Sequence, residues 1–171
     1  YQRECRSCGN ERLEDVVSLG LSPLANNLLE DKNQEEDLYP LEMKRCPECH
    51  NCQLSVVVPP EKMFDNYFYF SSQIKTLRDH FLDYATEVVS RFLEPTTSTV
   101  LEFGCNDGVL LKPLSSLGAN VEGVDPAKNI VKLAIDKGLN VYEEYFNDET
   151  FGSEEFKDKY DLVLSNNTFA H

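Results

Sequence analysis

The spacing of apolar and polar positions divides the chain into a first part with short strands and a second part in which strands and helices alternate. Strand-like runs occupy residues 39–44 and 53–58, on either side of a cysteine pair. Beyond them, apolar side chains recur at three- and four-residue steps from Ile74 to Phe92, which predicts a long amphipathic helix. Pro95 marks its end, because proline disfavours a helical conformation in the residue before it.

After this helix the pattern predicts the order β-α-β-α-β-α-β. The expected strands cover residues 100–103, 120–124, 140–142 and 160–165, and the expected helices follow residue 109, run from Pro126 to Lys137 and cover the acidic stretch 148–157. Pro113 is expected to kink or shorten the first of these helices. This order predicts a parallel sheet that binds ligands beyond the carboxyl ends of its strands.

A glycine turn joins the first of these strands to its helix. The turn, Gly104-Cys105-Asn106-Asp107-Gly108, has Asn106 and Val109 where a dinucleotide fingerprint requires glycine, which disfavours a nicotinamide-dependent enzyme. The Asp107 carboxylate would repel a phosphate and attract an ammonium group. Asp125 follows the second strand, at the distance where an acidic residue contacts ribose hydroxyls. The alternative is that these are ordinary turn glycines and that Asp125 only caps a helix.

Composition narrows the class of protein. Among 171 residues, 30 acidic against 16 basic side chains give a net charge of −14, which opposes nucleic acid and anionic membrane surfaces as partners. No apolar run approaches the roughly 18 residues of a membrane helix, and the N-terminus carries no secretory signal pattern. We therefore expect a cytoplasmic protein.

The six cysteines include two C-x-x-C pairs, which favour a metal site over disulfides in this setting. The four thiolates suit a closed, tetrahedral, structural Zn²⁺ site formed by Cys5, Cys8, Cys46 and Cys49. Reduced, unliganded cysteines or a disulfide are the alternatives. Cys52 is expected to be a buried thiol, and His50 is not expected to reach the metal. From this half alone, a non-catalytic zinc-ribbon binding or scaffold module is the alternative function.

Two motifs carry a resemblance to known enzymes. Glu102-x-Gly104-x-x-x-Gly108, followed by Gly123-Val124-Asp125-Pro126, resembles the S-adenosylmethionine (SAM) site of class I methyltransferases, with Asn106 in place of the middle glycine. A longer series resembles the zinc-binding, SAM-dependent sugar C-methyltransferases that act on nucleotide-linked 4-keto deoxysugars. It consists of both cysteine pairs, residues 22–26, Gln53-Leu54, Tyr67-x-Tyr69-Phe70-Ser71-Ser72, His80-Phe81, the glycine turn and Asn166-Asn167-Thr168.

This resemblance implies a fold, a domain division and a set of site residues. The fold is α/β: a small zinc-ribbon-like β domain at residues 1–60, an aromatic segment and linking helix at 61–95, and the first half of a Rossmann-like SAM-binding domain at 96–171. Tyr69 and His171 are implied to face a nucleotide-sugar substrate as catalytic residues. Either Glu102 or Asp107 is expected near the methionine ammonium group. The implied SAM-binding residues are Glu102, Gly104, Cys105, Asn106, Asp107, Gly108, Asp125, Phe146, Asn166 and Asn167.

The resemblance also implies that the chain is truncated. A class I methyltransferase sheet normally has seven strands, whereas the pattern here ends after the fourth. Much of the sugar-binding surface and the general base are then implied to lie beyond His171. We expect an uncovered sheet edge, which another chain or the missing half would cover.

Overall fold

The computed structural model describes residues 1–65 and 67–169, so the predicted catalytic residue His171 lies outside the described residues. The chain divides into two compact units, residues 1–63 and the residues from 64 onward. Each unit is described by itself. Within the described residues, no helix is both long and apolar enough to cross a membrane.

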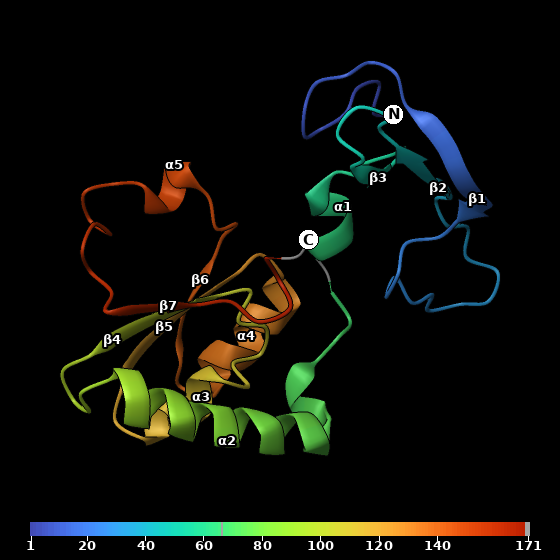
Figure 1. Cartoon of the computed structure of the whole chain (residues 1–171). Coiled ribbons are helices and arrows are strands. Elements are labelled where there is room, and N and C mark those ends of the chain that lie inside the picture. Colours follow the sequence, from blue (N-terminus) through green and yellow to red (C-terminus); the bar gives the residue numbers. More distant parts are fainter. Residues whose placement is uncertain (66, 170–171) are drawn as a thin grey trace. The chain divides into compact units, whose positions relative to one another are not determined.

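The first unit is a three-stranded antiparallel sheet of order β1-β2-β3 (Figure 1). Its elements are β1 Glu14–Ser22, β2 Tyr39–Arg45, β3 Cys52–Leu54 and the short helix α1 Pro60–Phe64. The predicted strand at 39–44 is confirmed as β2, whereas β3 covers only the start of the predicted run 53–58. The pattern did not predict β1, because two register shifts in its pairing with β2 break the two-residue alternation that marks a strand.

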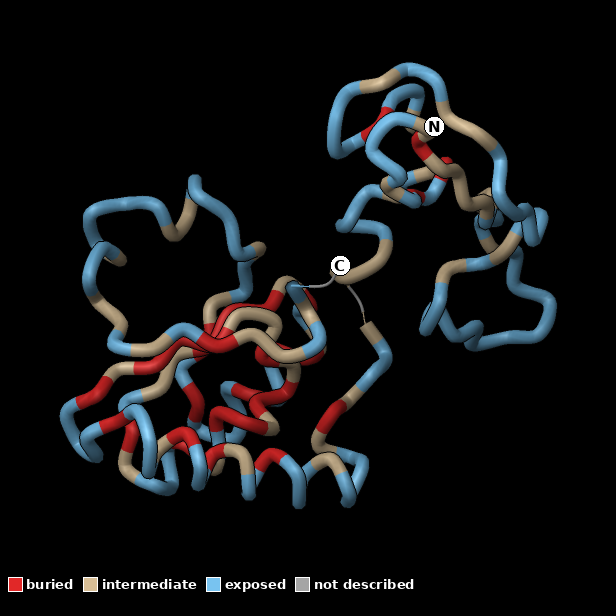
Figure 2. Tube along the Cα trace, viewed as in Figure 1, coloured by how far each residue is buried: buried red, intermediate tan, exposed pale blue. Residues whose placement is uncertain are grey.

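Little of the first unit is buried, as the scarcity of red on this part of the chain in Figure 2 shows. Among residues 1–63, all of which are described, the buried apolar side chains are those of Cys5 and Cys46, accompanied by the polar Gln53 and Ser55. The expectation for Cys52 is wrong: this thiol is exposed and the neighbouring Gln53 is buried. The Gln53 side chain of β3 points inward, where its amide accepts the Arg6 N–H and donates to the Glu4 carbonyl.

The second unit contains a parallel sheet of order β6-β5-β4-β7. The parallel α/β sheet predicted from the sequence is therefore confirmed. Its strands are β4 Thr99–Phe103, β5 Asn120–Asp125, β6 Asn140–Glu143 and β7 Leu162–Leu164. Its helices are η1 Ser71–Gln73, α2 Lys75–Phe92, α3 Leu111–Ser116, α4 Lys128–Asp136 and α5 Asp148–Phe151.

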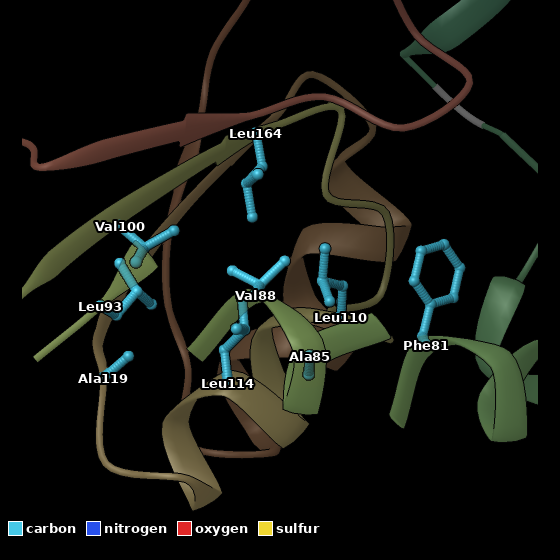
Figure 3. Close-up of a cluster of buried hydrophobic side chains, with 9 residues drawn as sticks. All are labelled: Phe81, Ala85, Val88, Leu93, Val100, Leu110, Leu114, Ala119 and Leu164. Atoms are coloured by element: carbon cyan, nitrogen blue, oxygen red, sulfur yellow. The ribbon is translucent and has the colours of Figure 1, made fainter. Parts of the chain in front are cut away.

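Helices α2, α3 and α4 cover one face of this sheet (Figure 1). Figure 3 shows the side chains of the larger cluster pointing toward one another: Phe81, Ala85, Val88, Leu93, Val100, Leu110, Leu114, Ala119 and Leu164. A second cluster joins α3 and α4 to β6 through Leu111, Val131, Ala134 and Val141. Val141 and Leu164 lie in one register row across the sheet, so the two clusters share a face.

Two helices, α4 and α5, differ from the prediction at their ends, and the short helix α3 contains Pro113. α4 begins at Lys128 rather than Pro126, because the Asp125 carboxylate accepts the Ala127 N–H and holds the chain extended before the helix. α3 tolerates Pro113 because it is the third residue of a short helix, where no preceding helical carbonyl needs its N–H. α5 stops at Phe151 instead of continuing to residue 157.

Candidate functional site

The four predicted metal ligands come together in the first unit. The sulfur atoms of Cys5, Cys8, Cys46 and Cys49 all lie within 4.8 Å of one another. Cys5 Sγ is 3.5 Å from Cys49 Sγ, and Cys8 Sγ is 3.7 Å from Cys46 Sγ. Four sulfur atoms at these separations can surround a single tetrahedral ion, and such thiolate sets suit zinc.

The backbone of each cysteine turn favours the thiolate form of its first cysteine, the form that a metal requires. The Cys49 N–H donates to the Cys46 sulfur, which, together with the Asn10 amide and against the effect of burial, lowers the pKa of Cys46 to about 6. Burial raises the pKa of Cys5, but the N–H groups of Cys8 and Ser7 outweigh it, and the net change is downward. The pKa of Cys8 shifts the other way: the Asn10 backbone contact lowers it, but the neighbouring cysteine sulfurs and burial outweigh this contact and raise the pKa to about 12. The first cysteine of each turn is therefore the one prepared as a thiolate for a cation.

In the second unit, the glycine turn leaves β4 at the point where the strand order reverses. β5 and β6 lie on one side of β4 and β7 lies on the other, so the crevice for a ligand is expected between the carboxyl ends of β4 and β7. Gly104 has φ +69°, and a Cβ there would lie 2.0 Å from Thr168 Oγ1 in the segment after β7. Both the left-handed backbone conformation of Gly104 and the closeness of Thr168 require glycine at this position.

Glu102 is the most unusual side chain at this crevice. It is buried near the end of β4, and its Oε1 accepts a hydrogen bond of 3.1 Å from the Asn166 amide after β7. Its Oε2 is buried without a hydrogen-bond partner among the described residues. Burial raises the pKa of Glu102 to about 8; the Asn166 amide opposes this rise, and the nearby Asp125 adds to it. A buried acceptor of this kind suits a cationic ligand group.

Asp125, at the end of β5, ties the turn to the next strand. Its Oδ2 accepts the Asn106 N–H at 2.9 Å and its Oδ1 accepts the Ala127 N–H at 3.0 Å. Burial raises its pKa, which these two N–H groups partly offset. The contacts fit the capping role that the sequence left open, and each carboxylate oxygen keeps a further lone pair.

The side chains of Asn106 and Asp107 hold an aromatic segment, residues 67–72, which we call the strap. Asn106 Oδ1 accepts the Ser71 N–H at 2.9 Å, and its Nδ2 donates to the Tyr69 carbonyl at 2.9 Å. The buried Asp107 carboxylate accepts from the Ser72 N–H and hydroxyl and pairs with Lys137 at 3.1 Å. Both side chains are therefore engaged in holding the strap.

Asn129 and Lys137 also contribute to the site, and sequence reasoning missed both of them. Asn129 on α4 accepts the Tyr67 N–H and donates to the Tyr67 carbonyl, which fixes the other end of the strap. Tyr69 is part-exposed on the strap. The feature that could have identified Asn129 is an asparagine amide that bonds to the backbone of the strap, as Asn106 also does. It cannot be found from the sequence pattern, because Asn129 is 62 residues from Tyr67 and only the fold brings the two together.

The remaining predicted cofactor residues occupy different surroundings. Phe146 follows β6 at the carboxyl edge of the sheet and stacks on Phe103 with ring centroids 4.3 Å apart, and the residue is 45% exposed. Cys105 instead points into the apolar cluster beneath α3, where a side chain cannot reach a ligand. Asn167 adopts a left-handed conformation with φ 55° beside Asn166. Gly108 has φ +77° and closes the turn against Leu139.

Comparisons with known proteins give a family match for each of the two units. A family model described as "Putative zinc binding domain" matches residues 5–64, and one described as "Methyltransferase domain" matches residues 77–171. The C-methyltransferase NovU of Streptomyces niveus is 35% identical over 173 residues, which cover 98% of this chain and 41% of that protein. The ubiquinone biosynthesis O-methyltransferase of Xanthomonas axonopodis pv. citri (strain 306) is 39% identical over 59 residues, 32% of this chain and 25% of that enzyme.

Among solved structures, the magnesium protoporphyrin IX methyltransferase (ChlM) of Synechocystis PCC 6803 with bound SAM gives a TM-score of 0.44 at 22% identity, covering 54% of this chain and 45% of that one. The chain spans less than half the length of the curated relatives that it matches. The methyltransferase-domain match, however, covers more than half of this chain and includes β4 to β7 with the glycine turn. The chain therefore belongs to the methyltransferase-domain family.

Proposed function

We propose that the chain is the zinc-binding and SAM-binding part of a SAM-dependent methyltransferase that methylates a carbon atom of a nucleotide-linked keto-deoxysugar. The methyl transfer is supported by the family match and by the relation to a C-methyltransferase over nearly the whole chain. The sugar substrate is supported by the sequence motifs that span both units.

The observation that carries the SAM proposal is the buried Oε2 of Glu102 at the reversal point of the sheet, which has no hydrogen-bond partner within residues 1–65 and 67–169. We assign it the methionine ammonium group, because that cation supplies the missing donors and favours the ionised carboxylate, which burial alone disfavours. Asn166 holds the other carboxylate oxygen and so fixes the direction in which Oε2 points.

Other residues around the carboxyl edge would hold the rest of the cofactor. The free lone pairs of Asp125 can accept from ribose hydroxyls, and the half-exposed Phe146 can contact an adenine ring. Gly104, Gly108 and Asn106, all with left-handed backbones, let the turn approach the cofactor closely. Asp107 and Asn167 would act through their backbone groups, whereas the Cys105 backbone is already bonded to the Val124 carbonyl and the Gly108 N–H.

Methylation at carbon requires removal of a proton next to a ketone and stabilisation of the resulting enolate. SAM, when bound, supplies an electrophilic methyl group on a sulfonium. We assign Tyr69 and His171 to the sugar: the Tyr69 hydroxyl can donate a hydrogen bond to the enolate oxygen, and the His171 imidazole can transfer a proton. The strap contacts of Asn106 would hold the backbone of Tyr69 in place for this task.

Isothermal titration of the chain with S-adenosylhomocysteine tests the cofactor site. Glu102→Gln should weaken binding by about 10-fold or more, the equivalent of one charge-assisted hydrogen bond of 1.5 to 3 kcal/mol. Glu87→Gln on the exposed side of α2 is the matched control and should bind like the wild type. Equal affinity of the two variants, or stabilisation by NAD or an oligonucleotide in place of the adenosyl ligand, would reject the proposal and leave a zinc-binding scaffold as the alternative.

The substrate is tested with the protein at its encoded length. Methyl-labelled SAM and a nucleotide-linked 4-keto deoxysugar should give a product with the label on a ring carbon, as read by NMR. A nucleotide sugar without the keto group should give none, because its C–H protons are not acidic. Label on oxygen would reject the C-methylation proposal.

We also propose that the free edge of β7 pairs with a strand from outside these 171 residues.

A further inference from the structure

The two cysteine turns of the first unit are built alike. Cys5-x-x-Cys8-Gly9-Asn10 and Cys46-x-x-Cys49-His50-Asn51 share the pattern C-x-x-C-x-N. In each turn, the first cysteine N–H donates to the asparagine carbonyl at 2.9 Å, and the fifth residue N–H donates to the first cysteine carbonyl at 2.8 or 3.0 Å. That fifth residue has a left-handed backbone in both turns, with φ 75° for Gly9 and 62° for His50.

Each asparagine side chain reaches across to the other turn. Asn10 Nδ2 lies 3.5 Å from Cys46 Sγ, and Asn51 Nδ2 lies 3.9 Å from Cys5 Sγ. The two sulfur atoms that receive these contacts belong to the buried cysteines, whereas Cys8 and Cys49 are exposed. A thiolate shielded from water needs a donor from the protein, and each asparagine supplies it to the partner turn.

Further contacts fix the direction of both amides. Asn10 Oδ1 accepts the Arg12 N–H at 3.1 Å, so its NH₂ group is the end that faces the sulfur. The Asn51 NH₂ group is shared with Gln53 Oε1 at 3.2 Å. Gln53 is itself buried, and it also accepts the Arg6 N–H and donates to the Glu4 carbonyl in the first turn.

We propose that Asn10 and Asn51 are reciprocal positioning residues of the zinc site, each stabilising the buried thiolate of the opposite turn and holding the two turns in register for the metal. The proposal rests on zinc as the occupant of the four-cysteine cluster, and it is independent of the SAM site. An ion bound by four thiolates carries net negative charge, which hydrogen bonds to the sulfur atoms spread onto the protein. Removing such partners typically costs 10- to 100-fold in metal affinity.

The test is a competition between the 171-residue chain and a chromophoric chelator for zinc. Asn10→Ala should weaken zinc binding about 10-fold or more, and Asn51→Ala should weaken it less, because its contact is longer and its amide is shared. Asn33→Ala, an exposed asparagine of the same unit, is the matched control. Asn10→Asp, which keeps the shape but replaces the donor with an acceptor, should lose more than Asn10→Ala.

Cobalt substitution gives a readout that a purely structural role would not move. The sulfur-to-cobalt charge-transfer band should shift in Asn10→Ala, because the Cys46 thiolate loses its donor, and stay in place in Asn33→Ala. Zinc affinity and cobalt spectrum equal to the control in both alanine variants would overturn the proposal. So would weakened binding confined to Asn10→Asp, since the added charge alone would then explain it.

Discussion

At the scale of single residues, Glu102 makes the stability of the second unit depend on pH. Burial raises its pKa from about 4.5 to about 8, so between these values the folded chain holds a proton that the unfolded chain has released. Stability is then highest below pH about 4.5 with respect to this group and falls as pH rises toward about 8, by at most about 1.4 kcal/mol per pH unit.

We therefore expect the urea midpoint of the second unit to decrease between about pH 5 and about pH 8 in the wild type, with a clearly smaller decrease in Glu102→Gln. NMR signals from the side chains of the larger cluster report on this unit alone. Glu87→Gln, which removes an exposed carboxylate, should keep the wild-type slope. A Glu102→Gln protein with an unchanged slope would show that another group takes up the proton.

The residue scale also shows what sequence patterns can and cannot predict. The spacing of Glu102, the glycine turn and Asp125 placed these groups at one edge of the sheet, because the carboxyl ends of parallel strands meet there. The directions of the Asn106 and Asp107 side chains were not predictable in this way. They depend on the strap, whose backbone groups come from 35 residues earlier in the chain.

At the scale of elements, the strap is held at two separate points, which can be released one at a time. Asn106→Gly keeps the left-handed backbone available and removes both contacts to Tyr69 and Ser71. We expect amide hydrogen exchange at Ser71 to accelerate about 10-fold or more, because the substitution lowers the free energy of local opening by about that of one hydrogen bond or more. Exchange at Tyr67, held by Asn129, should change little.

Asn129→Ala is the matched variant, with the reverse result expected: faster exchange at Tyr67 and nearly unchanged exchange at Ser71. If either substitution accelerates both amides equally, the strap opens as one piece and the two-point description is wrong. In the proposed enzyme, the Asn106 variant would also leave Tyr69 less well positioned.

Elements were predicted best where local pattern and packing agree. α2 presents a continuous apolar stripe to the sheet, and it runs from Lys75 to Phe92, as expected from the spacing. The stretch 148–157 has helical composition, yet α5 ends at Phe151. Phe151 and Phe156 instead pack on the Tyr142 ring, with centroids 6.0 and 5.9 Å away, and this aromatic cluster outweighs a weak local propensity.

At the scale of the whole molecule, the two units are stabilised by different means. Both apolar clusters consist of residues from Phe81 to Leu164 and lie in the second unit. In the first unit, whose residues are all described, strand β1 is largely exposed and the buried apolar side chains are two of the metal-binding cysteines. A domain of this size with so small a core depends on its metal.

We therefore expect zinc removal to unfold the first unit and to leave the second folded. After chelation, amide protection in β1 to β3 should be lost. New proteolytic cleavage should appear only before about residue 64, where the compact second unit begins. The thermal midpoint of the second unit should stay within about 2 °C of the zinc-loaded value, because none of its buried clusters includes a metal ligand.

Cys52→Ser should behave like the wild type, since this exposed thiol lies outside the metal cluster, whereas Cys46→Ser should resemble the chelated protein even with zinc present. Loss of protection in both units at the same chelator concentration would mean that the metal stabilises the chain as a whole.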